Sequence, residues 1–226
     1  MPLRVVLLLS LFPAVHPAQG SPSDGTPVVV LPRVDVEELL REDEERGNWP
    51  YRYGMPLVCA LDAEHAGAWE AQGQELVWRL VVRSPGALSL GAGFEPFELP
   101  AGGALTVAGG RDGKVLGPYT QRERGPDGRL VLEPLAGDEL VLEYRQPAAL
   151  AERPAFALSE VIHDYRGVLD EFREGEVYEL GSGCFVDANC AEGLPYQDHK
   201  RSVVRLLING YGCSGTLLNN TAEDQA

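Results

Sequence analysis

Apolar residues recur at every second position through much of the sequence, and this period constrains the fold more than any other feature. In the stretch ELVWRLVVR (75–83), four large apolar side chains fall on one face of an extended strand, while arginines fall on the other. The apolar face consists of Leu76, Trp78, Leu80 and Val82, and the opposite face carries Arg79 and Arg83. A period of two residues is typical of a β-strand that is buried on one face.

Further short segments of the same kind follow, and turn signals separate them. The segments read ALSLGAGF, GALTVAG, GRLVLEPL and DELVLEYR, and the turns fall at 84–86, 111–113, 126–128 and 136–138. The 26 glycines and 17 prolines of the chain suit this number of turns. The sequence therefore predicts an all-β protein with a β-sandwich domain over residues 50–147. We expect one more strand within FALSEVIHDYRGVLDEF, in a segment 148–180 that we interpret as a bridge to a second domain.

Residues 1–20 have the features of a signal peptide. Arg4 provides the positive start, VVLLLSLFPAV is an apolar run too short to span a bilayer, and Ala18 and Gly20 supply small residues before a cleavage point. The sequence therefore predicts secretion, to the extracellular space or the periplasm, with no membrane contact after cleavage.

Residues 21–49 are expected to form a linker and a short acidic helix. Asp35 is the predicted N-cap, Glu38 follows at the capping-box position, and Gly47 occupies the C′ position. We expect the acidic side chains of this helix to face solvent. The net charge of −15 argues against a nucleic-acid partner, because such proteins present basic patches to the phosphate backbone.

Two pairs of neighbouring residues resemble acid–base dyads. They are His163–Asp164 and Asp198–His199. Adjacent side chains on an extended strand point to opposite faces, so neither pair can form a hydrogen-bonded dyad in that conformation. We interpret these histidines as structural or surface residues.

Three further candidates also have structural explanations. Ser214 lies in GCSGT, which lacks the second glycine of a nucleophile elbow. Asp112 and Asp127 stand before glycines, where a turn accounts for them. The sequence contains no nucleotide-binding, zinc-protease or calcium-loop motif, so we expect no cofactor and no metal.

The C-terminal part has a different pattern of apolar residues. The run 203–208 is apolar on both faces except for Arg205, which predicts a strand buried on both sides. A second strand is expected over 211–218, with Cys213 at its centre. The spacing of Cys184, Cys190 and Cys213 fits no zinc pattern, and in a secreted protein we interpret them as disulfide candidates, while Cys59 has no assigned role.

The segments GSGCFVDANCAEG and RSVVRLLINGYGCSGTLLNNTAED resemble the start of the mature domain in secreted, lysyl-endopeptidase-like members of the trypsin superfamily. The matching positions are Cys184, Cys190, Gly193, Arg201, Cys213, Ser214, Gly215, Thr216, Leu217, Asn219 and Asn220. The upstream strands look like the β-sandwich propeptide of such enzymes. The resemblance implies that residues 181–226 begin a trypsin-like domain, as an incomplete first barrel of a chymotrypsin-like double β-barrel, and that the bridge 148–180 holds the maturation region.

The resemblance also implies a function. The product would be a secreted serine endopeptidase that acts on proteins or peptides in a full-length form. The catalytic histidine, aspartate and serine of the family belong to later segments, so we assign no catalytic residue here and expect this chain to be inactive. The sandwich would be a folding aid or inhibitor that contacts the protease domain in cis.

The resemblance further implies that Cys184, Cys190 and Cys213 bond to cysteines further along the polypeptide. Without those partners, the part from about Gly181 is expected to be poorly packed, with a free thiol at Cys213.

The alternative is a secreted, non-catalytic β-sandwich that binds carbohydrate or protein, with a vestigial protease-like tail. We favour the precursor, because the matching positions lie in one compact stretch.

Overall fold

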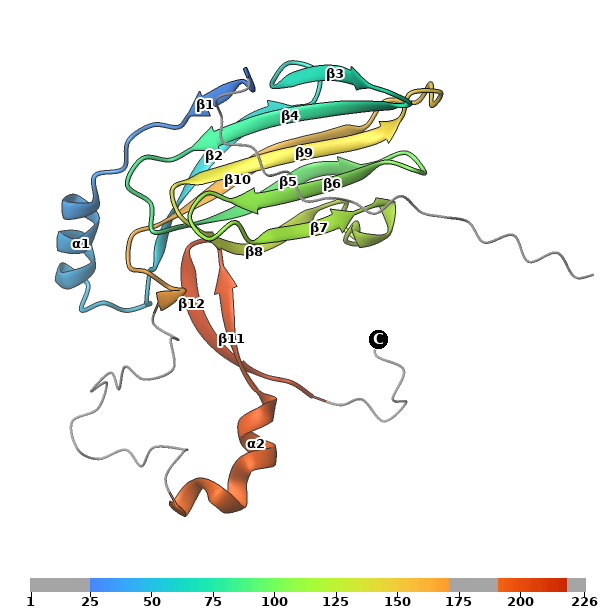
Figure 1. The fold of residues 1–226 in the computed structure, drawn as a ribbon. Helices are drawn as coiled ribbons and strands as arrows, with labels where there is room; N and C mark the ends of the chain where they lie inside the picture. Colours follow the sequence, from blue (N-terminus) through green and yellow to red (C-terminus); the bar gives the residue numbers. More distant parts are fainter. Residues whose placement is uncertain (1–24, 171–190, 219–226) are drawn as a thin grey trace, which may run out of the picture.

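Two β-sheets pack face to face in the computed structural model, which describes residues 25–170 and 191–218 (Figure 1). The larger sheet has the order β1-β4-β9-β6-β7, and β3 also pairs with β4. Its strands are β1 (Val28–Val30), β3 (Ala68–Gln72), β4 (Glu75–Arg83), β6 (Ala104–Gly109), β7 (Val115–Tyr119) and β9 (Glu139–Pro147). All of its pairings are antiparallel except the parallel pairing of β1 with β4.

The smaller sheet has the order β2-β10-β5-β8 and is antiparallel throughout. Its strands are β2 (Gly54–Asp62), β5 (Ser89–Glu98), β8 (Leu130–Ala136) and β10 (Ala155–Asp164). Outside the sandwich lie α1 (Val36–Glu45), η2 (Gln121–Glu123), η4 (Ala191–Tyr196), α2 (Gln197–Ser202) and the hairpin of β11 (Val203–Ile208) with β12 (Tyr211–Thr216). The all-β class predicted from the sequence is confirmed, as is its sandwich-like character.

The core lies between the two sheets. It is built from the apolar side chains that recur at every second position of the strands. Trp78, Leu80 and Val82 of β4 are fully buried in it, as the alternation predicted. The indole of Trp78 meets the ring of Phe156 edge to face, with centroids 5.2 Å apart, and Tyr144 lies 5.5 Å from the same ring. These aromatic contacts join the larger sheet to β10 in the smaller one.

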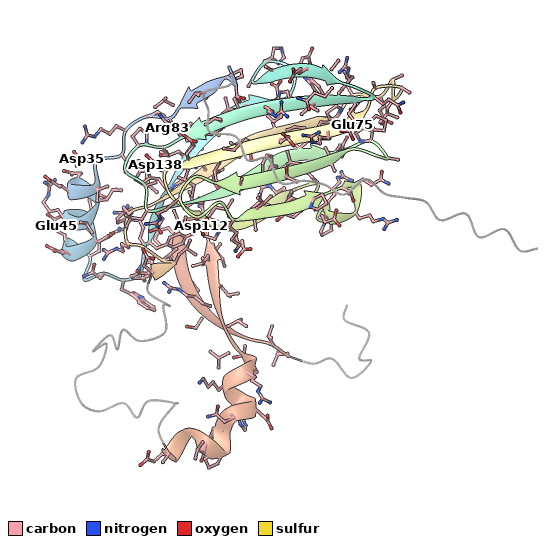
Figure 2. The ribbon with its side chains drawn as sticks, in the orientation of Figure 1. Asp35, Glu45, Glu75, Arg83, Asp112 and Asp138 are labelled. Atoms are coloured by element: carbon pink, nitrogen blue, oxygen red, sulfur yellow. The ribbon has the colours of Figure 1, made fainter. Side chains whose placement is uncertain are left out.

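The outer face of the larger sheet carries cross-strand ion pairs. The Arg79 guanidinium donates to Glu143 on the neighbouring strand at 2.7 Å, and Arg145 donates to the other oxygen of Glu143 at 2.6 Å. Arg83 pairs with Glu139 at the end of the same two strands (Figure 2). The predicted outward direction of Arg79 and Arg83 is therefore confirmed, and opposite charges face each other across the strands.

Helix α1 has the ends that its sequence predicted. The Asp35 carboxylate accepts a hydrogen bond from the Glu38 amide at 3.1 Å, and Gly47 adopts a positive φ of 70° just beyond the last turn. Figure 2 shows Asp35 and Glu45 at the two ends of this helix. The Asp35 carboxylate supplies an acceptor for an amide that has no partner within the helix.

The sandwich extends beyond the range 50–147. Strand β10 lies in the segment that we interpreted as a bridge, yet it is a central strand, bonded to β2 on one side and β5 on the other. Its inner residues Phe156, Leu158 and Val161 are buried in the main core. The sequence predicted this strand, but period alone could not show that it fills the middle of the smaller sheet.

The prediction that β11 is buried on both sides is wrong. Val203 and Ile208 are 60% and 57% exposed. Among the described residues this strand pairs only with β12. One face of the hairpin contacts the sandwich through Leu207, and the opposite face has no second layer in the described part of the chain.

Candidate functional site: the contact between the sandwich and the C-terminal hairpin

The hairpin turn is formed by two residues, Asn209 and Gly210. Both have positive φ, at 50° and 81°, and the flanking residues Ile208 and Tyr211 are paired across the strands. This is the geometry of a type I′ turn, for which Asn-Gly is the preferred sequence. This turn was not among the predicted ones, although the dipeptide between two apolar runs is a strong signal for a hairpin.

The turn is bonded directly to the start of β2. The Gly210 carbonyl accepts hydrogen bonds from the amides of Tyr53 at 2.8 Å and Gly54 at 3.1 Å. The Gly212 amide donates to the Tyr51 carbonyl at 2.9 Å. These bonds, together with an isolated bridge between Arg52 and Tyr211, attach the hairpin to the sandwich, and Figure 1 shows it projecting from the end of the two sheets.

A small apolar cluster lies under the hairpin. Tyr53, Ile162 and Val168 are almost fully buried, and Leu207 of β11 packs against them together with Tyr51. Ile162 lies on the outer face of the smaller sheet, because its neighbours Val161 and His163 point inward. The cluster therefore covers one end of that outer face and is separate from the main core.

Two arginines lie beside the ring of Tyr51. The guanidinium carbon of Arg205, from the hairpin, is 5.3 Å from the ring centroid, and that of Arg166, from the sandwich, is 5.6 Å away. A guanidinium at this distance is attracted by the ring quadrupole. Tyr51 therefore contributes side-chain contacts to the hairpin as well as a backbone bond.

The Asp43 carboxylate organises this region from helix α1. One oxygen accepts from Arg46 at 2.7 Å and Arg52 at 2.9 Å, and the other accepts from Tyr165 at 2.7 Å and Arg166 at 2.8 Å. Only 2% of the Asp43 side chain is exposed. Four donors on one carboxylate fix the helix, the start of β2 and the segment after β10 relative to one another.

The environment of Asp43 keeps it ionised. Burial acts to raise its pKa, but hydrogen bonds from Arg166, Tyr165 and Arg46 and the charge of Arg52 outweigh burial and lower the pKa to about 2. The prediction of a solvated face for the acidic helix is therefore wrong for Asp43, whose side chain is buried. Its position four residues after the buried Leu39, on the same side of the helix, was the available signal.

His163 and Asp164 are both fully buried, and they have different partners. The His163 Nδ1 is 2.7 Å from the Ser84 hydroxyl, and burial lowers the pKa of the imidazole. The Asp164 carboxylate accepts from the Ser89 hydroxyl at 2.6 Å and from the amides of Arg166, Gly167 and Val168. Asp164 thereby shapes the turn that carries Val168 under the hairpin, which agrees with a structural role.

The second suspected pair, Asp198–His199, is not extended as assumed. Both residues lie in helix α2, where consecutive side chains also point away from each other. Asp198 pairs with Arg201 at 3.1 Å and is 92% exposed. Asp198 and His199 are therefore helical and not extended, and they do not form a hydrogen-bonded dyad with each other.

The turn roles of the other aspartates are confirmed. Asp112 accepts from the Lys114 amide at 3.0 Å, and Asp127 accepts from the Arg129 amide at 3.2 Å. Figure 2 shows Asp112 near the edge of the larger sheet.

The residues that carry the family resemblance fall partly on β12. Cys213, Ser214, Gly215 and Thr216 belong to this strand, and Leu217 follows it with 63% of its side chain exposed. Ser214 is exposed and stands opposite Arg205. Gly193 and Arg201 lie in η4 and α2, and Cys184, Cys190, Asn219 and Asn220 lie outside the described residues.

The two described cysteines are both free thiols. Cys213 is exposed, whereas Cys59 is half-buried and its sulfur donates to the Leu158 carbonyl at 3.3 Å. Burial, with a smaller effect of the Glu160 charge, raises the pKa of the Cys59 thiol to about 11.

No family model matches the chain. Within residues 25–170 and 191–218, no group of three or more His, Cys, Asp or Glu residues is placed to hold a metal ion. In the same ranges, neither helix combines the length and the apolar character that a membrane span requires.

Proposed function

We propose that this chain is the N-terminal portion of a secreted serine endopeptidase precursor, and that its β-sandwich is a propeptide that holds the start of the protease domain. The sandwich would assist folding or inhibit the enzyme. The chain itself would not catalyse proteolysis, because the resemblance assigns the triad to later segments.

One observation carries the proposal. The hairpin that bears Cys213, Ser214 and Gly215 is bonded through its turn to the first residues of β2. A propeptide must recognise its enzyme through specific contacts, and here the segment that resembles the enzyme lies against the segment that resembles the propeptide. The fit at Gly210 supports a specific contact, since a Cβ atom there would stand 2.2 Å from the Gly54 carbonyl oxygen.

The test uses a purified trypsin-fold endopeptidase of the lysyl-endopeptidase type. The full chain, added in trans, should slow cleavage of a lysine-containing peptide or raise the activity recovered after the denatured enzyme is diluted into buffer. Bovine serum albumin at equal concentration is the control. The full chain alone should release no product from the peptide. If the chain affects neither cleavage nor refolding, the propeptide role is wrong.

A hollow beside Trp69 favours a second candidate, the non-catalytic binding module. The hollow has a volume of about 510 Å³, and its lining includes Trp69, Glu70 and Arg153. The Arg153 guanidinium lies 5.2 Å from the centroid of the indole ring. An open aromatic surface with charged groups suits a polar ligand such as a glycan. Titration of soluble glycans against wild-type chain and Trp69→Ala, followed by calorimetry, tests this candidate.

A further inference from the structure

A second exposed surface lies on the outer face of the smaller sheet, next to the hairpin contact. Register places Val58 opposite Glu160, Glu160 opposite Gly93, and Gly93 opposite Val131, so these four residues form one row across the sheet. Val58 is 87% exposed and Val131 is 75% exposed. Two large apolar side chains are therefore exposed to solvent, one at each end of this row of four residues. We call Val58, Glu160, Gly93 and Val131 the valine row.

Gly93 in this row is not explained by the packing of the sandwich. Its φ is not positive, and a Cβ atom there would meet only Glu160, at an ordinary distance of 3.8 Å. By contrast, a Cβ atom on Gly91 of the same face would stand only 3.3 Å from the Cβ atom of Ile162. A glycine inside a strand weakens it and often marks the close approach of another backbone. The described residues do not require a glycine at this position, and its missing side chain leaves room for the close approach of another backbone.

The valine row is continuous with the hairpin contact. The adjacent row on the same face contains Pro56, Ile162 and Gly91. Ile162 is covered by the apolar cluster under the hairpin, and the hairpin turn lies over Pro56, where a Cβ atom on Gly210 would be 3.5 Å from the proline ring. The two rows are separated by two residues along each strand, which is about 7 Å. The exposed valine row therefore lies directly beside the row that the hairpin covers.

The hairpin itself indicates what would cover the row. Its outward face carries Leu206 and Ile208, which are 40% and 57% exposed. A two-stranded hairpin is at best marginally stable by itself, and under the proposed function the protease domain that begins with it supplies the larger unit. A domain of about 100 residues has a radius of gyration of about 13 Å, which exceeds the row spacing, so a domain built on this hairpin is large enough to reach the valine row.

From these relations we infer that the valine row is a second contact of the sandwich with the folded domain that begins with β11 and β12. This inference rests on the proposed function and extends it, because it assigns a surface that the hairpin itself does not touch. Val58 and Val131 are the apolar anchors, and Gly93 lets the partner backbone approach between them.

The experiment measures inhibition of a lysyl-endopeptidase-type protease by the full chain and its variants in trans. All variants are compared in the wild-type and in the Gly210→Ala background, because the chain's own hairpin competes for the neighbouring site. Val58→Lys combined with Val131→Lys should raise the inhibition constant by about tenfold or more, as expected when central apolar contacts are lost. Gly93→Ala should raise it in the same direction without lowering the melting temperature.

Val30→Lys is the matched control. Val30 is 59% exposed on β1 of the other sheet, and the inhibition constant should change by less than about twofold. If wild type inhibits and the valine-row variants inhibit equally well, the second contact is wrong while the proposed function stands. If no chain inhibits the protease in either background and none raises the activity recovered after refolding, the proposed function and the second contact are both wrong.

Discussion

Gly210 lies so close to Gly54 that a Cβ atom on Gly210 would stand 2.2 Å from the Gly54 carbonyl oxygen. The Gly210 carbonyl also accepts from the Gly54 amide at 3.1 Å. The hairpin turn and the start of β2 are therefore in direct backbone contact, which no side chain larger than hydrogen permits at this position.

Gly210→Ala is expected to release the hairpin from the sandwich. The alanine must move away from Gly54, which breaks the bonds to Tyr53 and Gly54. Hydrogen exchange followed by mass spectrometry should show faster exchange over residues 203–216 and little change in β4 and β9. The control is Gly113→Ala, since Gly113 also has a positive φ, of 67°, but nothing lies within 4 Å of its Cβ position. Equal exchange in the hairpins of the two variants would contradict the close contact.

Asp43→Asn should destabilise the sandwich strongly. The substitution removes the charge that Arg52 and Arg166 share, and Arg52 is only 9% exposed. Breaking a buried ion pair by removing one partner costs about 3–5 kcal/mol, and the Glu42 carboxylate that stays 2.9 Å from Arg52 places the expected loss at the lower end, which urea unfolding followed by circular dichroism measures. Glu45→Gln on the same helix is the control, because Glu45 is 72% exposed and its loss should cost less than about 0.5 kcal/mol. A loss of stability no larger than that of the control would show that Asp43 does not organise the region.

Acid should destabilise the chain in two stages. Burial lowers the pKa of His163 in the folded chain below its ordinary 6.5. As pH falls below about 6.5, His163 therefore takes up a proton in the unfolded chain before it does so in the folded chain, and the free energy of unfolding decreases. The pKa of Asp43 is lowered to about 2 from 3.8, so its contribution is complete above about 3.8 and is lost as pH falls to about 2. The measurement is the free energy of unfolding in urea as a function of pH.

His163→Asn separates the first stage from the second. Asparagine can bond to Ser84 but does not titrate, so the slope of stability against pH should flatten between about pH 7 and pH 5 while the loss near pH 3 persists. An unchanged slope in the upper range would mean that His163 is not the responsible group.

The two described thiols should differ in reactivity. Cys213 is exposed, whereas Cys59 is half-buried with its pKa raised to about 11, which reduces its thiolate fraction at neutral pH. Native chain treated with Ellman's reagent should show a fast phase whose amplitude falls by one thiol in Cys213→Ser. Cys59→Ser should leave that amplitude unchanged. A fast phase that keeps its amplitude in Cys213→Ser and loses one thiol in Cys59→Ser would contradict the assignment.

The sequence by itself determined the elements whose signal is local. The alternation of Leu80 and Val82 with Arg79 specified which face of the strand enters the core, although Val77 and Val81 on the arginine face are buried as well. Asp35 with Gly47 specified the ends of the helix. Each signal depends only on the pleat or the cap of its own segment. The Asn209–Gly210 turn belongs to the same class, because its signal is a dipeptide between two apolar runs.

Tertiary structure alone decided which strands are neighbours and which polar groups are buried. Strand β10 joins β2 and β5 although β10 is distant from both in sequence, and no period encodes that pairing. In the sequence, Asp43 is one of several acids in a charged helix, which predicts exposure. In the fold, Arg52 and Arg166 lie against its carboxylate and it is buried. The physical reason is the same in both cases: burial of a strand or a charge depends on partners far along the chain, and only the folded backbone brings them together.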